Sequence, residues 1–130
     1  MALERVNPPS LARPSGFSHA VVATGRMVFL AGQVALGADG AIIGDTVAEQ
    51  FGRALANLLE ALRAAGGSPG DLASLTVYVT DLEDYRSHAR AIGAVWRQLA
   101  GRDYSAMAAV GVSRLWDAAA LVELQGFAVV

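Results

Sequence analysis

The chain has 130 residues, of which 54% are apolar and 17% are charged. This length predicts one domain spanning residues 1–130, and the apolar composition excludes intrinsic disorder. Twelve acidic and ten basic side chains give a net charge of −2, and the basic ones are scattered along the chain. Because no basic cluster forms, we expect no nucleic-acid partner.

Two missing residue types exclude whole classes of chemistry. The chain has no lysine, which excludes a Schiff base on an enzyme amine. It has no cysteine, which excludes disulfides and thiolate nucleophiles. With only His19 and His88 as histidines, we expect no metal and no cofactor. No apolar run reaches the roughly 18 residues of a membrane span, and no signal peptide is recognisable, so we expect a cytoplasmic location without membrane contact.

The first part of the chain predicts strands. Residues 1–16 are rich in proline, serine and arginine and predict a short strand or arm followed by a loop. Ser18–Ala31 contains two apolar β-prone runs separated by Thr24–Arg26, which is typical of a β-hairpin. Gly37–Gly40 then predicts a turn.

A helix is predicted over residues 47–65, where apolar residues recur with helical spacing. Thr46 and Glu49 match a capping box, in which each side chain bonds a free backbone amide at the helix start. Gly66 and Gly67 predict its end.

The second half predicts a strand, a helix and two further strands. Residues 72–80 alternate between apolar and polar, as in a half-exposed strand. Asp81 predicts the cap of a second helix that ends at Gly101. The tail predicts strands over Ser105–Val112 and Ala119–Val129. The expected inner face of the second helix comprises Tyr85, His88, Ile92, Val95, Trp96 and Leu99.

This order of elements predicts an α+β fold, with a mixed β-sheet and two helices on one face. The opposite face of the sheet is also apolar, as the runs Val21–Ala23 and Leu121–Val130 indicate. A 130-residue domain buries only about two-thirds of its unfolded surface. We therefore expect that this face is covered by another copy of the chain.

Glu123 is the strongest candidate for chemistry, because it is the only acid in the last 13 residues and its neighbours are apolar. A carboxylate on a buried strand is costly unless it is hydrogen-bonded or transfers protons. The alternative is a carboxylate at a strand edge that reaches water or a backbone amide. His19 could act as a general base or be a satisfied strand histidine, and His88 is expected to pack against the core.

Five segments of the sequence resemble the Rid family, also called YjgF or L-PSP endoribonuclease. They are Pro14–Ala20, Val28–Gln33, Gln50, Leu75–Asp81 and Leu121–Leu124. The resemblance implies a chorismate-mutase-like fold and a homotrimer around a central β-barrel, with helices outside. It also implies a small-molecule ligand in a cleft at each subunit interface.

The best-known members of this family are deaminases that hydrolyse enamines and imines such as 2-aminoacrylate. The resemblance places their catalytic glutamate at Glu123, while Met107 stands where they have the arginine that binds the substrate carboxylate. Three further polar positions of the family are also apolar in this chain, namely Phe17, Ala31 and Ala89. The resemblance thus predicts a cleft lined by Phe17, Ala31, Gly32, Met107 and Glu123, with His19 at its rim.

Two hypotheses about function follow. In the first, the protein hydrolyses an enamine or imine that is uncharged or apolar, with Glu123 activating water. Standard 2-imino acids are disfavoured because Met107 cannot bind a carboxylate. In the second, the protein is a non-catalytic trimer that binds a small ligand or serves in regulation. A ribonuclease role is disfavoured by the acidic pI of about 5.6 and the lack of a basic stripe.

Overall fold

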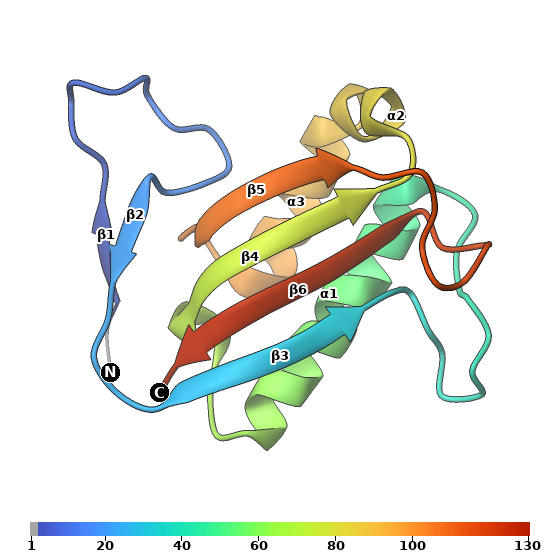
Figure 1. Cartoon of the computed structure of the whole chain (residues 1–130), viewed down its shortest axis with the longest axis horizontal. Coiled ribbons are helices and arrows are strands. Elements are labelled where there is room, and N and C mark those ends of the chain that lie inside the picture. The colour runs from blue at the N-terminus through green and yellow to red at the C-terminus, as the bar shows by residue number, and fades with distance from the viewer. Residues whose placement is uncertain (1–2) are drawn as a thin grey trace.

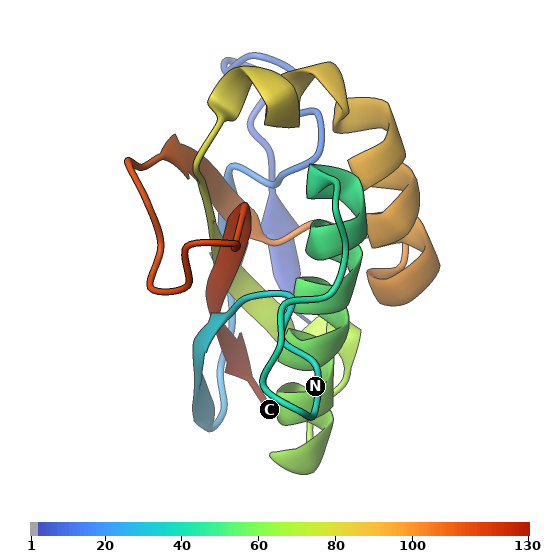
Figure 2. The same ribbon diagram turned by 90° about the vertical axis from the view of Figure 1, so that its right-hand side faces the viewer.

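The computed structural model describes residues 3–130 and shows a sheet covered by helices on one face (Figures 1 and 2). The sheet has the order β3 (Met27–Gln33), β6 (Val122–Val129), β4 (Leu72–Val79) and β5 (Ala106–Gly111). Strand β6 runs antiparallel to β3 and β4, whereas β5 runs parallel to β4. The expected mixed sheet is therefore confirmed.

Three helices lie in the second layer. The long helices α1 (Val47–Ala64) and α3 (Ala89–Ala100) lie side by side behind the sheet, and the short α2 (Leu82–Ser87) precedes α3 (Figure 2). A short 3₁₀ helix, Pro69–Asp71, leads into β4. Within residues 3–130, no helix combines the length and apolarity needed to cross a bilayer.

The core forms between α1 and the sheet because strand alternation and helical periodicity direct apolar side chains to the same layer. Leu75, Val77 and Val79 of β4 are buried on that side, and so are Leu124 and Val122 of β6. The buried residues of α1 that meet them are Val47, Gln50, Phe51, Ala54, Leu55, Leu58, Leu59 and Leu62.

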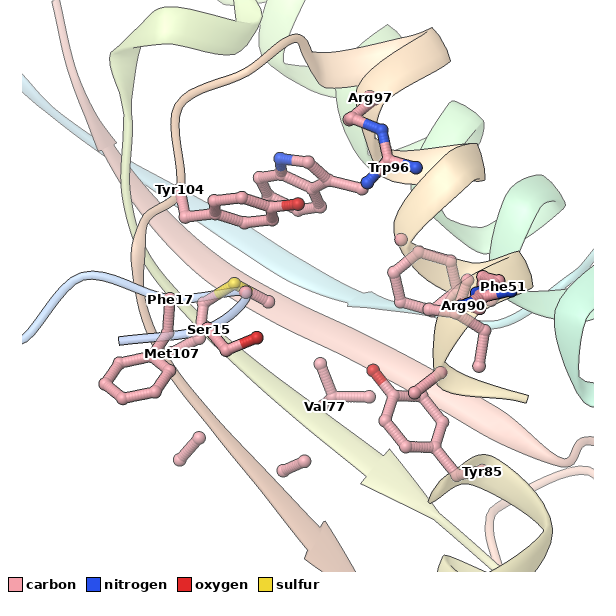
Figure 3. Close-up of a pocket in the computed structure, with 16 residues that line it drawn as sticks. Ser15, Phe17, Phe51, Val77, Tyr85, Arg90, Trp96, Arg97, Tyr104 and Met107 are labelled. Atoms are coloured by element: carbon pink, nitrogen blue, oxygen red, sulfur yellow. The ribbon is translucent and has the colours of Figure 1, made fainter. Parts of the chain in front are cut away.

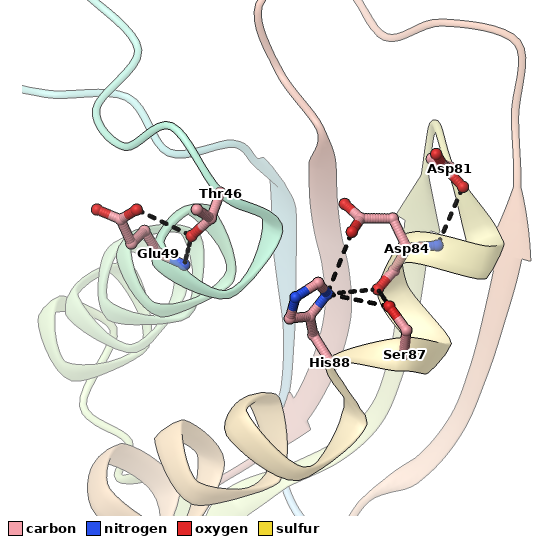
Figure 4. A network of polar contacts seen from close by, with 6 residues as sticks. All are labelled: Thr46, Glu49, Asp81, Asp84, Ser87 and His88. Carbon is pink, nitrogen blue, oxygen red and sulfur yellow. Dashed lines mark hydrogen bonds and ion pairs between the residues drawn. The ribbon is translucent and has the colours of Figure 1, made fainter.

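Helix α1 begins and ends where the sequence predicts. The Thr46 hydroxyl accepts a hydrogen bond from the Glu49 amide at 3.2 Å and donates to the Glu49 carboxylate at 2.9 Å (Figure 4). The carboxylate thus bonds the capping hydroxyl and not the Thr46 amide. At the other end, the Gly67 amide donates to the Leu62 carbonyl at 2.9 Å, and Gly66 adopts φ of +92°.

The hairpin expected over Ser18–Ala31 does not form. Strand β2 (Ala20–Val22) pairs with β1 (Glu4–Val6) in a separate two-stranded sheet, while β3 pairs with β6. The prediction was wrong because each run finds a partner far away in the sequence, which a local turn pattern cannot reveal. The segment between β2 and β3 instead connects the two sheets (Figure 1).

The second predicted helix is divided at His88, where φ and ψ of −108° and 18° separate α2 from α3. Nδ1 of His88 lies 2.8 Å from the Asp84 carbonyl and 3.1 Å from the Asp84 carboxylate, and the Ser87 hydroxyl donates to the same carbonyl (Figure 4). These contacts hold His88 on the surface. The expectation that His88 packs against the core was therefore wrong.

The sheet face away from the helices carries an exposed apolar patch on β3 and β6, whereas β4 presents Ser74, Thr76 and Tyr78 on this face. The expectation of an apolar face is therefore met only in part. Phe29 of β3 is 71% exposed and Phe127 of β6 is 38% exposed. Their rings meet edge to face, with centroids 5.4 Å apart. Met27 extends the same patch and is also exposed.

Candidate functional site

A pocket of about 590 Å³ lies between α3 and the β5 side of the sheet (Figure 3). Its walls are mostly apolar, and its edge is formed by the segment that precedes β2. The larger apolar side chains that line it are Phe17, Phe51, Val77, Ile92, Trp96 and Met107, and Ala89, Ala108 and Ala109 complete the apolar lining. A volume of this size suits a small organic ligand.

Met107 enters this pocket because of the register between β4 and β5. It pairs with Leu75, whose side chain is buried beneath the helices, so Met107 also points to the helix side of the sheet. Its side chain is half-buried and packs against the edge of the core. The residue that resemblance aligns with the family arginine is therefore part of a pocket wall.

Phe17 lies in the same pocket because the next residue, Ser18, is hydrogen-bonded to the segment that leads into β5. The buried Ser18 donates from its amide to the Ser105 carbonyl at 2.9 Å and from its hydroxyl to the Tyr104 carbonyl at 2.7 Å. These two bonds attach the segment before β2 to the start of β5. Phe17 and Met107, which the resemblance placed in one cleft, are thus brought together within one chain.

A stacked aromatic pair forms another wall. The indole N–H of Trp96 donates to the Asp103 carbonyl at 3.0 Å. This bond orients the indole so that Tyr104 stacks on it, with ring centroids 5.5 Å apart and planes 15° from parallel (Figure 3). Tyr104 thus packs against Trp96 at the pocket wall.

The pocket also contains polar groups that the sequence reasoning missed. The Tyr85 hydroxyl points toward its middle (Figure 3). Burial raises the pKa of the Tyr85 phenol above its ordinary value of 10.0, so this hydroxyl is protonated at neutral pH. Arg90 and Arg97 of α3 line the same pocket.

The spacing of these two arginines was a usable signal. Residues seven apart complete about two helical turns and lie on the same face. A Cβ built on Gly93 would lie 3.5 Å from Nη1 of Arg97, so the Arg97 side chain runs back along the helix over Gly93 toward Arg90. The sequence did not show that this face borders a pocket.

Glu123 and Gly32 form a second group on the opposite face of the sheet. Glu123 pairs with Tyr78, whose side chain points away from the helices. Its half-buried carboxylate lies over Gly32, where β3 contains a bulge between Leu30 and Gln33. Within residues 3–130, the Glu123 side chain makes no hydrogen bond and no ion pair.

The remaining predicted residues lie near these groups. Ala31 is exposed beside Gly32 in the bulge. His19 borders a second depression, which it shares with Phe17 and Met107 as well as with Ser74 and Thr76. Nε2 of His19 donates to the Ala12 carbonyl at 2.7 Å, which leaves Nδ1 as the acceptor of the neutral ring.

A single chain therefore does not assemble the whole predicted cleft. Phe17 and Met107 line both the helix-side pocket and the depression beside His19, while Gly32 and Glu123 meet elsewhere, on the open face of the sheet away from the helices. The grouping of all these residues into one site stays a prediction, and it requires two subunits.

A family model described as endoribonuclease L-PSP matches residues 9–130 of the chain. The chain belongs to the Rid family, which this model describes. A RutC family protein from Pyrococcus abyssi is 30% identical over 129 residues, which cover 98% of each chain. The sequence motifs had indicated the same family.

Solved Rid structures share the fold. YyfB from Yersinia pestis, described as a Rid protein of unknown function, is 34% identical over the full length of both chains, with a TM-score of 0.89. YjgF from E. coli is 28% identical with a TM-score of 0.71, covering 95% of this chain and 93% of that one. TdcF from E. coli, solved with bound serine, gives a TM-score of 0.72 at 28% identity, covering 100% and 98%. This chain thus has the chorismate-mutase-like α+β fold.

Proposed function

We propose that this Rid protein is a homotrimer that hydrolyses a small reactive enamine or imine whose reacting end is apolar. Family membership supports a role in handling a small metabolite, either deaminase-like or regulatory. The observation that carries the more specific proposal is the apolar pocket that joins Phe17 to Met107, together with a half-buried carboxylate that has no partner within residues 3–130.

The exposed aromatic face supports the trimer. Phe29 and Phe127 are large, adjacent and accessible on the open face of the sheet. Apolar surface of this kind is typical of a subunit interface. The proposed trimer covers the patch and brings Glu123 of one subunit to the pocket of the next. A cytoplasmic location remains a prediction from the sequence.

Glu123 would act as the general base in this site. A water molecule adds to the carbon of the C=N bond as Glu123 removes one of its protons. The carboxylic acid then returns that proton to nitrogen, which gives a carbinolamine. Glu123 next takes the proton of the new hydroxyl group and passes it to nitrogen as the C–N bond breaks, so that the carbonyl product and ammonia leave. An enamine first takes a proton at carbon and loses one from nitrogen to become the imine. Overall, one imine and one water give one carbonyl compound and one ammonia.

Met107 determines which groups on the imine carbon the site accepts. A charged hydrogen bond to a carboxylate contributes about 1.5–3 kcal/mol, and a thioether offers no donor for one. A carboxylate directly on the imine carbon would thus lie against an apolar wall. We expect that 2-aminoacrylate is a poor substrate and that imines with alkyl or aryl groups on this carbon are better ones.

The alternative function is a non-catalytic trimer that binds a small ligand. It is favoured by the same apolar pocket, because Glu123 is not needed to bind an apolar molecule. The two functions differ in one measurable respect, which is whether removing the carboxylate of Glu123 changes a rate.

The deciding experiment compares the wild-type protein with Glu123→Gln on a panel of imines and enamines, with ammonia release as the readout. Loss of a general base lowers rates about 100-fold or more. Glu60→Gln is the matched control, since Glu60 lies on the exposed side of α1 in an ion pair with Arg63. Equal, near-background rates for all three proteins would favour the non-catalytic alternative.

A further inference from the structure

Arg90 and Arg97 are the two arginines that line this pocket. Arg5, Arg63 and Arg86 each lie within 4.0 Å of a carboxylate. In the part of the chain that the structure describes, neither Arg90 nor Arg97 has such a partner, although both are exposed at the pocket. Two positive charges thus stand uncompensated beside an apolar cavity.

The rest of the pocket is suited to an anion as well. None of the 16 residues that line it is acidic (Figure 3). The hydroxyl of Tyr85 can donate a hydrogen bond inside it. Arginine binds carboxylates through two parallel N–H groups.

We propose that this pocket binds an amphipathic carboxylate, with its apolar body between Trp96 and Met107 and its carboxylate held by Arg90 and Arg97. The part of this inference that concerns substrates rests on the proposed function. It names the substrate class as imines or enamines that are apolar at the reacting carbon and carry a carboxylate several bonds away. This class differs from the uncharged substrate expected from the sequence, because that expectation did not include the two arginines at the pocket.

This assignment separates two ends of the ligand. Met107 and Phe17 lie at the β5 side of the pocket, where the trimer would bring a neighbouring Glu123. The arginines lie on α3, which forms the opposite wall. The anion is therefore kept away from both the apolar reacting end and the catalytic carboxylate, which would repel it.

The test measures binding with a matched pair of probes, 4-phenylbutyrate and its neutral amide. Trp96 and Trp116 are the two tryptophans of the chain, and Trp116 is exposed outside the pocket. In a Trp116→Phe background, fluorescence therefore reports on Trp96 alone. We expect the carboxylate to bind about tenfold more tightly than the amide, and the difference to shrink in 0.5 M salt because the arginines are exposed.

Variants test whether Arg90 and Arg97 cause the tighter binding of the carboxylate. In the double variant Arg90→Gln/Arg97→Gln, carboxylate affinity should fall about tenfold to that of the amide, while amide affinity stays within twofold. Arg86→Gln is the matched control, because Arg86 pairs with Glu83 outside the pocket, and it should change neither value. The inference is overturned if wild-type protein binds both probes equally, if it binds neither, or if the double variant keeps the preference.

The binding measurement tests the inference whether or not the protein hydrolyses imines. Glu123→Gln should keep the carboxylate preference, because the arginines lie on α3, on the wall opposite the end of the pocket to which the trimer would bring a neighbouring Glu123. If the wild-type protein prefers the carboxylate and the double variant does not, the binding inference stands even when no imine is hydrolysed. In that case only the proposed hydrolysis fails.

Discussion

The carboxylate of Glu123 occupies the space that a side chain at Gly32 would need. A Cβ built on Gly32 would lie 2.9 Å from Cδ of Glu123 and closer still to Oε2. Gly32 has no left-handed φ, so its backbone conformation is open to other residues. Crowding by Glu123 is therefore the feature that excludes a side chain at this position.

Gly32→Ala should consequently move the Glu123 carboxylate without unfolding the protein. The displaced group is the end of a flexible side chain, so we expect stability in urea unfolding to change by less than about 1 kcal/mol. Imine hydrolysis should fall nearly as far as in Glu123→Gln. Gly70→Ala is the control, since a Cβ there meets open space. Full activity in Gly32→Ala would show that the position of Glu123 over Gly32 does not matter.

A charge on the open face should break the assembly. Light scattering is expected to give the wild-type protein a mass of three times 13.5 kDa, and Phe29→Asp should give the monomer mass, because Phe29 contributes exposed aromatic surface beside Phe127. Ala64→Glu places a charge at an exposed position of α1 and should leave the mass unchanged. A wild-type monomer at micromolar concentration would contradict the proposed trimer.

Met107→Arg should create a site for short carboxylates. Position 107 points into the pocket beside Phe17, so a guanidinium there can bind a 2-keto acid or benzoate through two hydrogen bonds. We expect affinity measured by calorimetry to rise at least tenfold over the wild-type protein. Met107→Leu keeps the wall apolar and should show no gain. No gain in Met107→Arg would mean that the side chain at position 107 does not reach the ligand.

Gln50 is the polar residue on which the entry to β6 depends. It is only 2% exposed, and its amide donates to the Gly44 and Ala119 carbonyls at 3.1 Å and accepts from the Leu121 amide at 2.8 Å. Gln50→Leu leaves buried backbone groups unpaired, so unfolding free energy should fall by about 2–4 kcal/mol. The exposed Gln98→Leu should cost far less in the same denaturation series.

Tyr85 should make stability fall at high pH. Because burial raises the pKa of its phenol, the unfolded chain releases the proton at a lower pH than the folded chain does. The folded state therefore loses stability as the pH rises above about 10 toward the folded-state pKa. Melting curves from pH 8 to 11 should decline more steeply for the wild-type protein than for Tyr85→Phe. Parallel curves would contradict this role.

Elements governed by neighbouring residues could be predicted from the sequence. The capping residue Thr46 and the closing Gly66 both act within one helical turn of α1, and both were placed correctly. The partners of β2 and β3 could not be predicted, because pairing with β1 and β6 depends on residues distant in sequence. His88 was misplaced because its contact with Asp84 competes with apolar spacing.

The same difference between local features and long-range pairing decides how much of the candidate site could be predicted. The resemblance placed Phe17 with Met107, and the fold joins them. Motif alignment carries no information about which side of a sheet each residue faces, so the separation of Glu123 from Met107 became visible only in the strand register. Arg90 and Arg97 were missed because the pocket that they line forms between α3 and β5, and the sequence does not show that these two elements lie together.

Strand β6 is the last element of the chain, yet it lies between β3 and β4. During synthesis, β3 therefore leaves the ribosome with no strand to pair with, and β4 can form only its contact with β5. The four-stranded sheet can close only after β6 has emerged. Until then, the apolar sides of α1 and β3 remain accessible, which makes the nascent chain a candidate for chaperone binding.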